Sequence, residues 1–166
     1  MGSGRIIDVF LLAENRLLRE ALVRLLGKEN DVRVVGANPY SPAVREEIMA
    51  VRPSIILLDS NGLAFSKTSL IPTLQASMPD VKMIVVDVDS NESKFLKAVH
   101  DGVVGYLSKN ARAVEVAATI RAVSFGEAVY PSALSMGFVP RVSTGDGLGS
   151  RTRPQPDTAL SRRGAA

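Results

Sequence analysis

The sequence has no cysteine, no tryptophan and only one histidine, His100, among its 166 residues. Without cysteine the chain can form neither a disulfide nor a thiolate zinc site, and a single histidine excludes a histidine-based metal site or catalytic triad. Two phosphate-binding loops, Gly-x-Gly-x-x-Gly and Walker A, are also missing. These absences disfavour an enzyme, including a phosphotransferase or a nucleotide-dependent reductase.

Long apolar runs are missing as well. No segment approaches the roughly 18 consecutive apolar residues of a membrane span, and the first residues, MGSG, lack the charged and apolar regions of a signal peptide. A content of 46% hydrophobic and 22% charged residues is ordinary for a globular protein. We expect no membrane association and a location in the reducing cytoplasm.

Charge is unevenly distributed along the chain. Residues 1–131 carry 15 basic and 15 acidic side chains, whereas residues 132–166 carry five arginines and two aspartates, which supplies the whole net charge of +3. A short basic segment that also contains Gly, Ser and Pro is typical of a solvated linker rather than of a nucleic-acid site. The main part of the chain is therefore neutral, and we expect the tail to be a linker.

The main part alternates short apolar runs with longer segments of helical periodicity, the pattern of repeated βαβ units. Several of the apolar runs are nearly continuous, as in strands covered on both faces. We expect a parallel sheet. The predicted strands are 7–12, 32–36, 55–58, 82–86 and 105–107, and the predicted helices are 16–27, 41–51, 67–76, 92–101 and 113–125.

Two charged residues close strands of this sheet. Asp59 follows the apolar run 55–58, and Lys109 closes the segment that begins at residue 105. The carboxyl ends of parallel strands meet along one edge, where ligands bind in folds of this class. The sequence therefore predicts a functional site at that edge.

Three stretches of the sequence resemble the receiver domain of bacterial response regulators, and most closely the NarL/FixJ (LuxR-type) subclass. They are residues 8–22 (DVFLLAENRLLREAL), 52–59 (RPSIILLD) and 102–111 (GVVGYLSKNA). The resemblance covers about residues 5–131. It implies an α/β fold of the flavodoxin-like (CheY-like) (βα)5 type, a three-layer sandwich with five parallel strands in the order 2-1-3-4-5.

The tail contains a further short resemblance. Residues 159–163 (ALSRR) look like the opening of the helix-turn-helix module that follows the linker in such regulators. Residues 132–166 would then be a linker leading toward a DNA-binding domain absent from this sequence. The alternative is that these five residues are an arbitrary tail.

The resemblance assigns roles to residues at the predicted edge. Asp59 corresponds to the phosphoacceptor, and Lys109 to the lysine that binds phosphoryl oxygens. The positions that ordinarily hold a hydroxyl and a small residue after the fourth strand are Asp87 and Val88 here. An ionised carboxylate at Asp87 repels a phosphoryl group and cannot donate to it, so we expect poor phosphorylation.

The metal site implied by the resemblance is also altered. Ala13 and Glu14 occupy the places of the usual acidic pair, so one carboxylate is lost. Candidate ligands are Glu14, Asp59 and Asn61, and because Mg²⁺ demands near-ideal octahedral geometry we expect weak binding and no required cofactor.

One hypothesis joins these residues. Lys109 would be held between Asp59 and Asp87 as a built-in counter-ion that locks the pocket. Two alternatives stay open: the three groups are merely solvated strand ends, or Asp87 replaces the lost metal ligand. Tyr106 resembles the aromatic that changes rotamer on receiver activation, although an aromatic in a strand is equally explained by packing.

The expected function is that of an atypical receiver domain that controls DNA-binding output through dimerisation. The implied partners are a second copy of the chain, DNA through the absent helix-turn-helix domain, and a sensor histidine kinase. The alternative is a phosphorylation-independent pseudo-receiver that senses a small molecule, in the altered pocket or in a neighbouring cleft.

Overall fold

The computed structural model describes residues 4–59, 70–88 and 92–130, and of residues 87, 88, 92 and 94 it describes the backbone alone. The chain divides into two compact units, residues 1–134 and 135–166, and all described residues belong to the first. The predicted boundary between residues 131 and 132 thus lies outside the described residues and stays a prediction.

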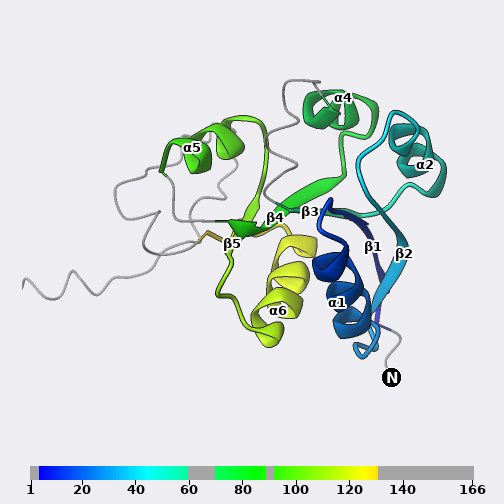
Figure 1. Ribbon diagram of the computed structural model, residues 1–166, viewed down its shortest axis with the longest axis vertical. Coiled ribbons are helices and arrows are strands. Elements are labelled where there is room, and N and C mark those ends of the chain that lie inside the picture. Colours follow the sequence, from blue (N-terminus) through cyan, green and yellow to red (C-terminus); the bar gives the residue numbers. More distant parts are fainter. Residues whose placement is uncertain (1–3, 60–69, 89–91, 131–166) are drawn as a thin grey trace, which may run out of the picture. The chain divides into compact units, whose positions relative to one another are not determined.

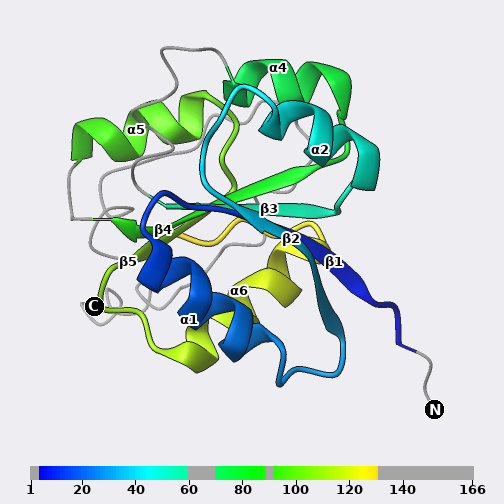
Figure 2. The same cartoon turned by 45° about the vertical axis from the view of Figure 1, so that its right-hand side comes forward.

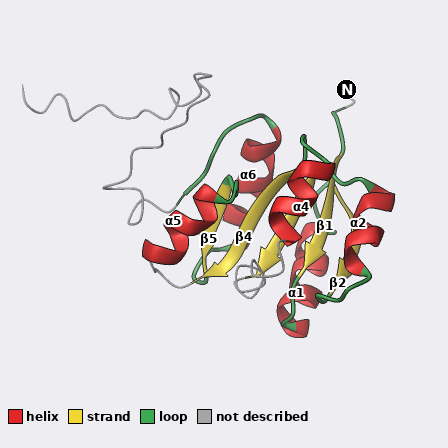
Figure 3. Cartoon of the chain, turned by 90° about the horizontal axis from the view of Figure 1, so that it is seen from above, coloured by secondary structure: helices red, strands yellow, loops and turns green. Residues whose placement is uncertain are grey.

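A five-stranded parallel sheet forms the centre of the first unit. Its strands stand in the order β2-β1-β3-β4-β5, and Figure 3 shows the arrows pointing the same way. The predicted fold class and strand order are confirmed. The strands are β1 (Ile7–Leu12), β2 (Val32–Asn38), β3 (Ile55–Asp59), β4 (Lys82–Val88) and β5 (Gly105–Ser108).

Helices cover both faces of the sheet. In Figures 1 and 2, α1 and α6 lie on one face, and α2, α4 and α5 lie on the other. This gives the three layers expected of the fold. The helices are α1 (Arg16–Leu26), α2 (Val44–Val51), α4 (Leu70–Ser77), α5 (Glu92–His100) and α6 (Ala113–Ser124).

The helix predicted to begin at residue 41 begins three residues later, and this prediction was wrong at its start. The backbone N–H of Val44 donates to the carbonyl of Ser41 at 3.1 Å, so residues 41–43 form a turn instead. Ala43 is the N-cap and makes no side-chain capping bond. The side chain of Val44 is 1% exposed and packs the first turn of the helix into the core.

The core explains why the central strands read as unbroken apolar runs. All four apolar residues of β3, Ile55 to Leu58, are at most 1% exposed, since helices cover both faces of this strand. On the face covered by α1 and α6, residues of both helices join the same core cluster. No helix in the described part of the chain is long and apolar enough to cross a membrane.

An ion-pair cluster ties α6 to the turn after α1. The guanidinium of Arg121 donates from Nε and Nη2 to the two carboxylate oxygens of Asp31 at 2.8 and 3.0 Å, and Nη2 also donates to Glu29. The hydrogen bond and charge of Arg121 lower the pKa of Asp31, with the hydrogen bond the larger cause. These contacts fix the C-terminal part of α6 to the turn after α1.

Candidate functional site

The carboxyl ends of the strands gather along one edge of the sheet. Strand pairing sets Leu12 beside Leu58, Asp59 beside Val86, and Val88 beside Ser108. Asp59 is the last residue of β3, and Lys109 directly follows β5 with an exposed side chain. Asp59 and Lys109 thus lie at the edge where sequence reasoning placed them.

Asp59 is buried and accepts hydrogen bonds from the backbone of the β1–α1 loop. The residue is only 1% exposed to solvent. Oδ2 accepts from the backbone N–H of Glu14 at 2.7 Å and from that of Asn15 at 3.3 Å. Asn15 is also the N-cap of α1, where its side chain accepts from the N–H of Leu18. The carboxylate therefore lies at the N-terminus of α1, whose dipole favours negative charge.

Glu14 reaches away from Asp59 toward the segment that follows β2. Its Oε2 accepts from the backbone N–H of Tyr40 at 3.0 Å, in a solvent-exposed contact. The same two segments are joined by the N–H of Ala13, which donates to the carbonyl of Asn38 at 3.2 Å. The loop after β1 is thus attached to β3 on one side and to the residues after β2 on the other.

Tyr40 completes the site, and sequence reasoning missed it. The oxygen of its hydroxyl is shielded from solvent. Burial raises the pKa of this phenol most, the negative charges of Asp59 and Glu14 raise it further, and hydrogen bonding to Asp59 also contributes. A signal was available, because Tyr40 is an aromatic within the turn-forming run Asn38-Pro39-Tyr40-Ser41-Pro42.

The structure describes the remaining predicted site residues only in part. Asp87 and Val88 are the last two residues of β4, which was predicted to end at residue 86, and their side chains lie outside the described part of the structure. Asn61 lies outside it entirely. The placement of Lys109 between Asp59 and Asp87 therefore stays a prediction.

Weak Mg²⁺ binding stays a prediction, because Asn61 and the side chain of Asp87 lie outside the described residues. In the described residues, no three carboxylate or imidazole groups gather into a metal site. Ala13 offers no side-chain ligand, and oxygens of Glu14 and Asp59 already accept from backbone N–H groups. A hard cation would have to bind the remaining lone pairs of these carboxylates or replace these hydrogen bonds.

Tyr106 is fully packed. It is 1% exposed, and its ring meets that of Phe95 edge to face at 5.1 Å, while Phe95 meets Tyr130 in the same way at 5.3 Å. These three rings connect β5, α5 and the residues after α6. The packing interpretation of Tyr106 is sufficient for this arrangement, and its proposed switching role stays a prediction.

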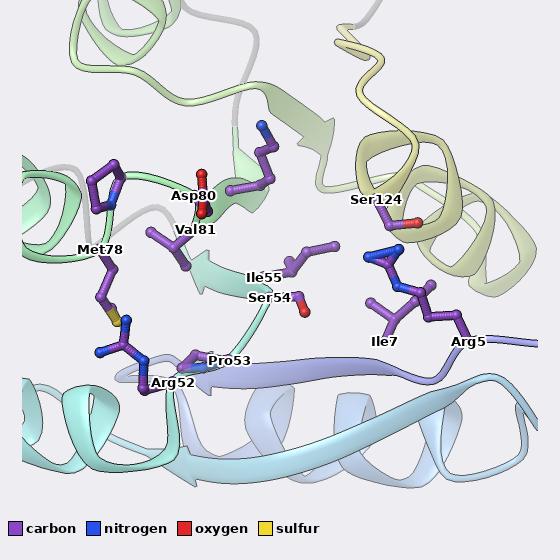
Figure 4. Close-up of a pocket in the computed structure, with 12 residues that line it drawn as sticks. Arg5, Ile7, Arg52, Pro53, Ser54, Ile55, Met78, Asp80, Val81 and Ser124 are labelled. Atoms are coloured by element: carbon purple, nitrogen blue, oxygen red, sulfur yellow. The ribbon is translucent and has the colours of Figure 1, made fainter.

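A separate cavity lies at the opposite edge of the sheet, near the amino ends of β1, β3 and β4. It has a volume of about 430 Å³ and is lined by apolar residues, two serines and the charged side chains of Arg5, Arg52, Asp80 and Lys82. Figure 4 shows Arg5 and Arg52 on different sides of it, so these two guanidinium groups do not meet at one point. Arg52 has a left-handed backbone, φ 46°, which is unusual for a residue with a side chain.

Comparison with known proteins found no matching family model. A Ycf55-like protein of Synechocystis is 24% identical over 136 residues. The DNA-binding transcriptional activator DevR/DosR of Mycobacterium tuberculosis is 26% identical over 123 residues, and the transcriptional regulatory protein DesR of Bacillus subtilis is 27% identical over 124. These matches include 81%, 74% and 75% of this chain but 24%, 57% and 61% of the relatives, so the chain spans less than two thirds of their lengths.

Solved structures agree with the fold. The signal receiver domain of NarL from Mycobacterium tuberculosis superposes with a TM-score of 0.65 at 22% identity, over 75% of this chain and 100% of that one. A LuxR-family two-component response regulator from Aurantimonas gives 0.68 at 17% identity, over 79% and 94%. RcsB, in a structure of dimers bound to DNA, gives 0.66 at 14% identity, over 80% and 67%. The resemblance to response regulators is confirmed, and the chain is a homologue of NarL/LuxR-type response regulators with the fold of their receiver domain.

Proposed function

We propose that this receiver domain controls the output of a transcription regulator while its phosphoacceptor position is held closed by donors of the protein itself. Phosphorylation at Asp59 would be poor for that reason, and dimerisation would carry the signal. The observation that carries the proposal is the buried carboxylate of Asp59 and its hydrogen bonds to the N–H groups of Glu14 and Asn15.

A buried carboxylate in this state resists phosphoryl transfer. The reaction requires an oxygen of Asp59 to attack phosphorus, and the carboxylate charge that holds the loop amides is lost when the acyl phosphate forms. A hydrogen bond to a charged group contributes about 1.5–3 kcal/mol. Both amides donate to Oδ2, which remains as a neutral carbonyl oxygen when Oδ1 attacks, so the bonds weaken and the penalty is on the order of 2 kcal/mol. Asp87, at the position of the usual hydroxyl, adds electrostatic repulsion to this penalty.

Reaction with acetyl phosphate tests the proposal. The full chain is incubated with acetyl phosphate and Mg²⁺, and its intact mass is followed beside that of a receiver with the ordinary acidic pair and hydroxyl. We expect little gain of phosphoryl mass in this chain under conditions that modify the reference completely. Rapid modification that Asp59→Asn abolishes would contradict the proposal.

Dimerisation is supported by exposed apolar side chains on α1 and α6, the two helices that cover one face of the sheet. Leu17 and Val114, in the first turns of these helices, are 76% and 65% exposed. Single exposed apolar residues are ordinary, but two on neighbouring helices favour a contact with another apolar surface. RcsB, which has the same fold, forms dimers on DNA. We propose that a second copy of this chain covers Leu17 and Val114.

Light scattering over a range of concentrations tests the dimer. Leu17→Glu and Val114→Glu are expected to shift the mass toward the monomer, because an interface core excludes unpaired charge. Leu96→Glu is the control, since Leu96 is 43% exposed but lies on α5, on the other face. A mass unaffected by the first two substitutions, or lowered equally by the control, would contradict this interface.

The remaining parts of the proposal concern the whole regulator. Residues 132–166 would lead to a helix-turn-helix domain that binds DNA, in a cytoplasmic protein, and a sensor histidine kinase would act on it only weakly. DevR/DosR, a relative of which the chain covers 57%, is named as a DNA-binding transcriptional activator. Whether the reading frame continues past residue 166 into such a domain tests this part directly.

A second candidate function is the sensing of a small molecule, and the cavity at the amino edge of the sheet favours it. Its volume of about 430 Å³ lies in the range of ligand sites, and basic Arg5, Arg52 and Lys82 outnumber acidic Asp80. An organic anion is the fitting ligand class. Citrate is a suitable probe: a rise in melting temperature that is lost in Arg52→Gln would support sensing, and the absence of any rise would count against it.

A further inference from the structure

Tyr40 lies where the residues after β2 meet the loop after β1. The last residue of β2, Asn38, pairs with Leu12 and accepts from the N–H of Ala13. Tyr40 follows two positions later, so the backbone brings it beside the loop in which Glu14 and Asn15 donate their N–H groups to Asp59. An aromatic side chain at this point can cover the carboxylate.

Two attachments hold Tyr40 in place. Its backbone N–H donates to Oε2 of Glu14 at 3.0 Å, and the oxygen of its hydroxyl is buried although the residues around it in the chain are exposed. Burial raises the pKa of this phenol most, and the negative charge of Asp59 raises it further. A protonated phenol beside a buried carboxylate offers it a further donor.

We propose that Tyr40 is the gate of the Asp59 pocket: its side chain covers the carboxylate, and displacement of residues 39–43 exposes Asp59 to a phosphoryl donor. This inference rests on the proposed function, because it names the part of the molecule that keeps Asp59 from reacting. Tyr40 is a positioning residue in this role and takes no part in bond formation.

The surroundings of Tyr40 suit a segment that moves. Residues 39, 41, 42 and 43 are exposed, and Val44 is the first fully buried side chain after Tyr40. The segment can therefore lift without exposing other core residues. The hydrogen bond to Glu14 is open to solvent, where water replaces it at little cost. The prolines at positions 39 and 42 restrict the backbone, so the segment is expected to move as a unit.

Opening the gate by mutation tests the inference. The native chain, Tyr40→Phe and Tyr40→Ala are treated with acetyl phosphate and Mg²⁺, and phosphoryl mass is followed with time. An oxygen of Asp59 attacks phosphorus, the bond between phosphorus and the acetyl oxygen breaks, and acetate leaves. We expect Tyr40→Ala to react at least about ten times faster than the native chain, a barrier change of about 1.4 kcal/mol, and Tyr40→Phe to fall between them.

Controls separate the gate from other effects. Tyr130→Phe removes the hydroxyl of another partly buried tyrosine, which donates to the carbonyl of Val103, and is expected to react like the native chain. Asp59→Asn combined with Tyr40→Ala is expected not to react at all. Circular dichroism melting shows that each variant is folded, and Tyr40→Phe keeps the test available if the alanine variant unfolds.

The outcomes distinguish the two claims. A slow native chain with a fast Tyr40→Ala variant supports the gate. A slow native chain with folded Tyr40 variants that are equally slow overturns the gate and leaves the poorly reactive pocket standing. A native chain that reacts as fast as an ordinary receiver overturns both the poor reactivity and the gate.

Discussion

Replacement of Asp59 by asparagine is expected to destabilise the domain. The buried carboxylate accepts from the backbone N–H groups of Glu14 and Asn15, and its negative charge helps to raise the pKa of the Tyr40 phenol. Asparagine keeps the shape but loses the charge, and its amide nitrogen is a donor that would face other donors. The substitution tests whether the hydrogen bonds to this carboxylate stabilise the domain or whether its buried charge destabilises it.

The size of the effect follows from the hydrogen bonds. The 2.7 Å bond to Glu14 is short and charge-assisted, worth about 1.5–3 kcal/mol, and the 3.3 Å bond to Asn15 is weaker. Asparagine retains part of both through its oxygen, so we expect a net loss of about 2 kcal/mol. For a domain of this size, that corresponds to a melting temperature lower by roughly 8 °C.

Calorimetry at neutral pH, in the absence of divalent cations, measures this difference. Asp8→Asn is the control, because Asp8 pairs with Arg33 at the surface and such a pair contributes about 0–1 kcal/mol. If Asp59 were an acid destabilised by unpaired negative charge, its neutralisation would raise the melting temperature. An unchanged or higher value for Asp59→Asn would therefore refute the reasoning.

Three further predictions follow from individual contacts in the structure. Asp59→Asn should lower the pKa of the Tyr40 phenol, because it removes a negative charge that disfavours the phenolate. Tyrosine ring ¹³C shifts during an alkaline titration would measure this pKa, and an unchanged value would contradict the prediction. Arg121→Lys should cost about 1 kcal/mol of unfolding free energy in urea, because lysine cannot bind both oxygens of Asp31. Since the native pKa of Asp31 is lowered, this stabilisation is present above the unfolded pKa and is lost as pH falls through the native one, so the two proteins should converge in stability below about pH 4; a constant difference would contradict it. Gly36→Ala should destabilise by about 1–3 kcal/mol, because the added methyl would lie 2.4 Å from the buried phenylalanine ring on β1, and an unchanged urea midpoint would count against this close contact.

The strands were predictable because their burial is visible in the sequence. The run 55–58 is apolar at every position, and all four residues are buried by helices on both faces. The end of β2 was predicted two residues too early. Ala37 and Asn38 favour strands only weakly, and they are in β2 because they pair with Leu11 and Leu12 of β1, a contact between distant segments.

The candidate site was predictable only in outline. The position of Asp59 after an apolar run places it at the carboxyl edge of any parallel sheet. Its hydrogen bonds to loop amides depend on the backbone of residues 13–15, which side-chain patterns do not determine. The role of Tyr40 depends on a contact with Glu14 across 26 positions in the chain. Local periodicity contains no information on such a contact.

The state of the backbone amides beside Asp59 tests most directly whether the protein itself satisfies this carboxylate. The ¹⁵N-labelled chain is titrated with beryllofluoride and Mg²⁺, and the amide resonances of Glu14 and Asn15 are followed. We predict that both remain at their positions at concentrations that saturate an ordinary receiver. Movement of both resonances to a new, saturated position would show that the anion and the metal replace these hydrogen bonds readily, and would contradict a pocket closed by its own donors.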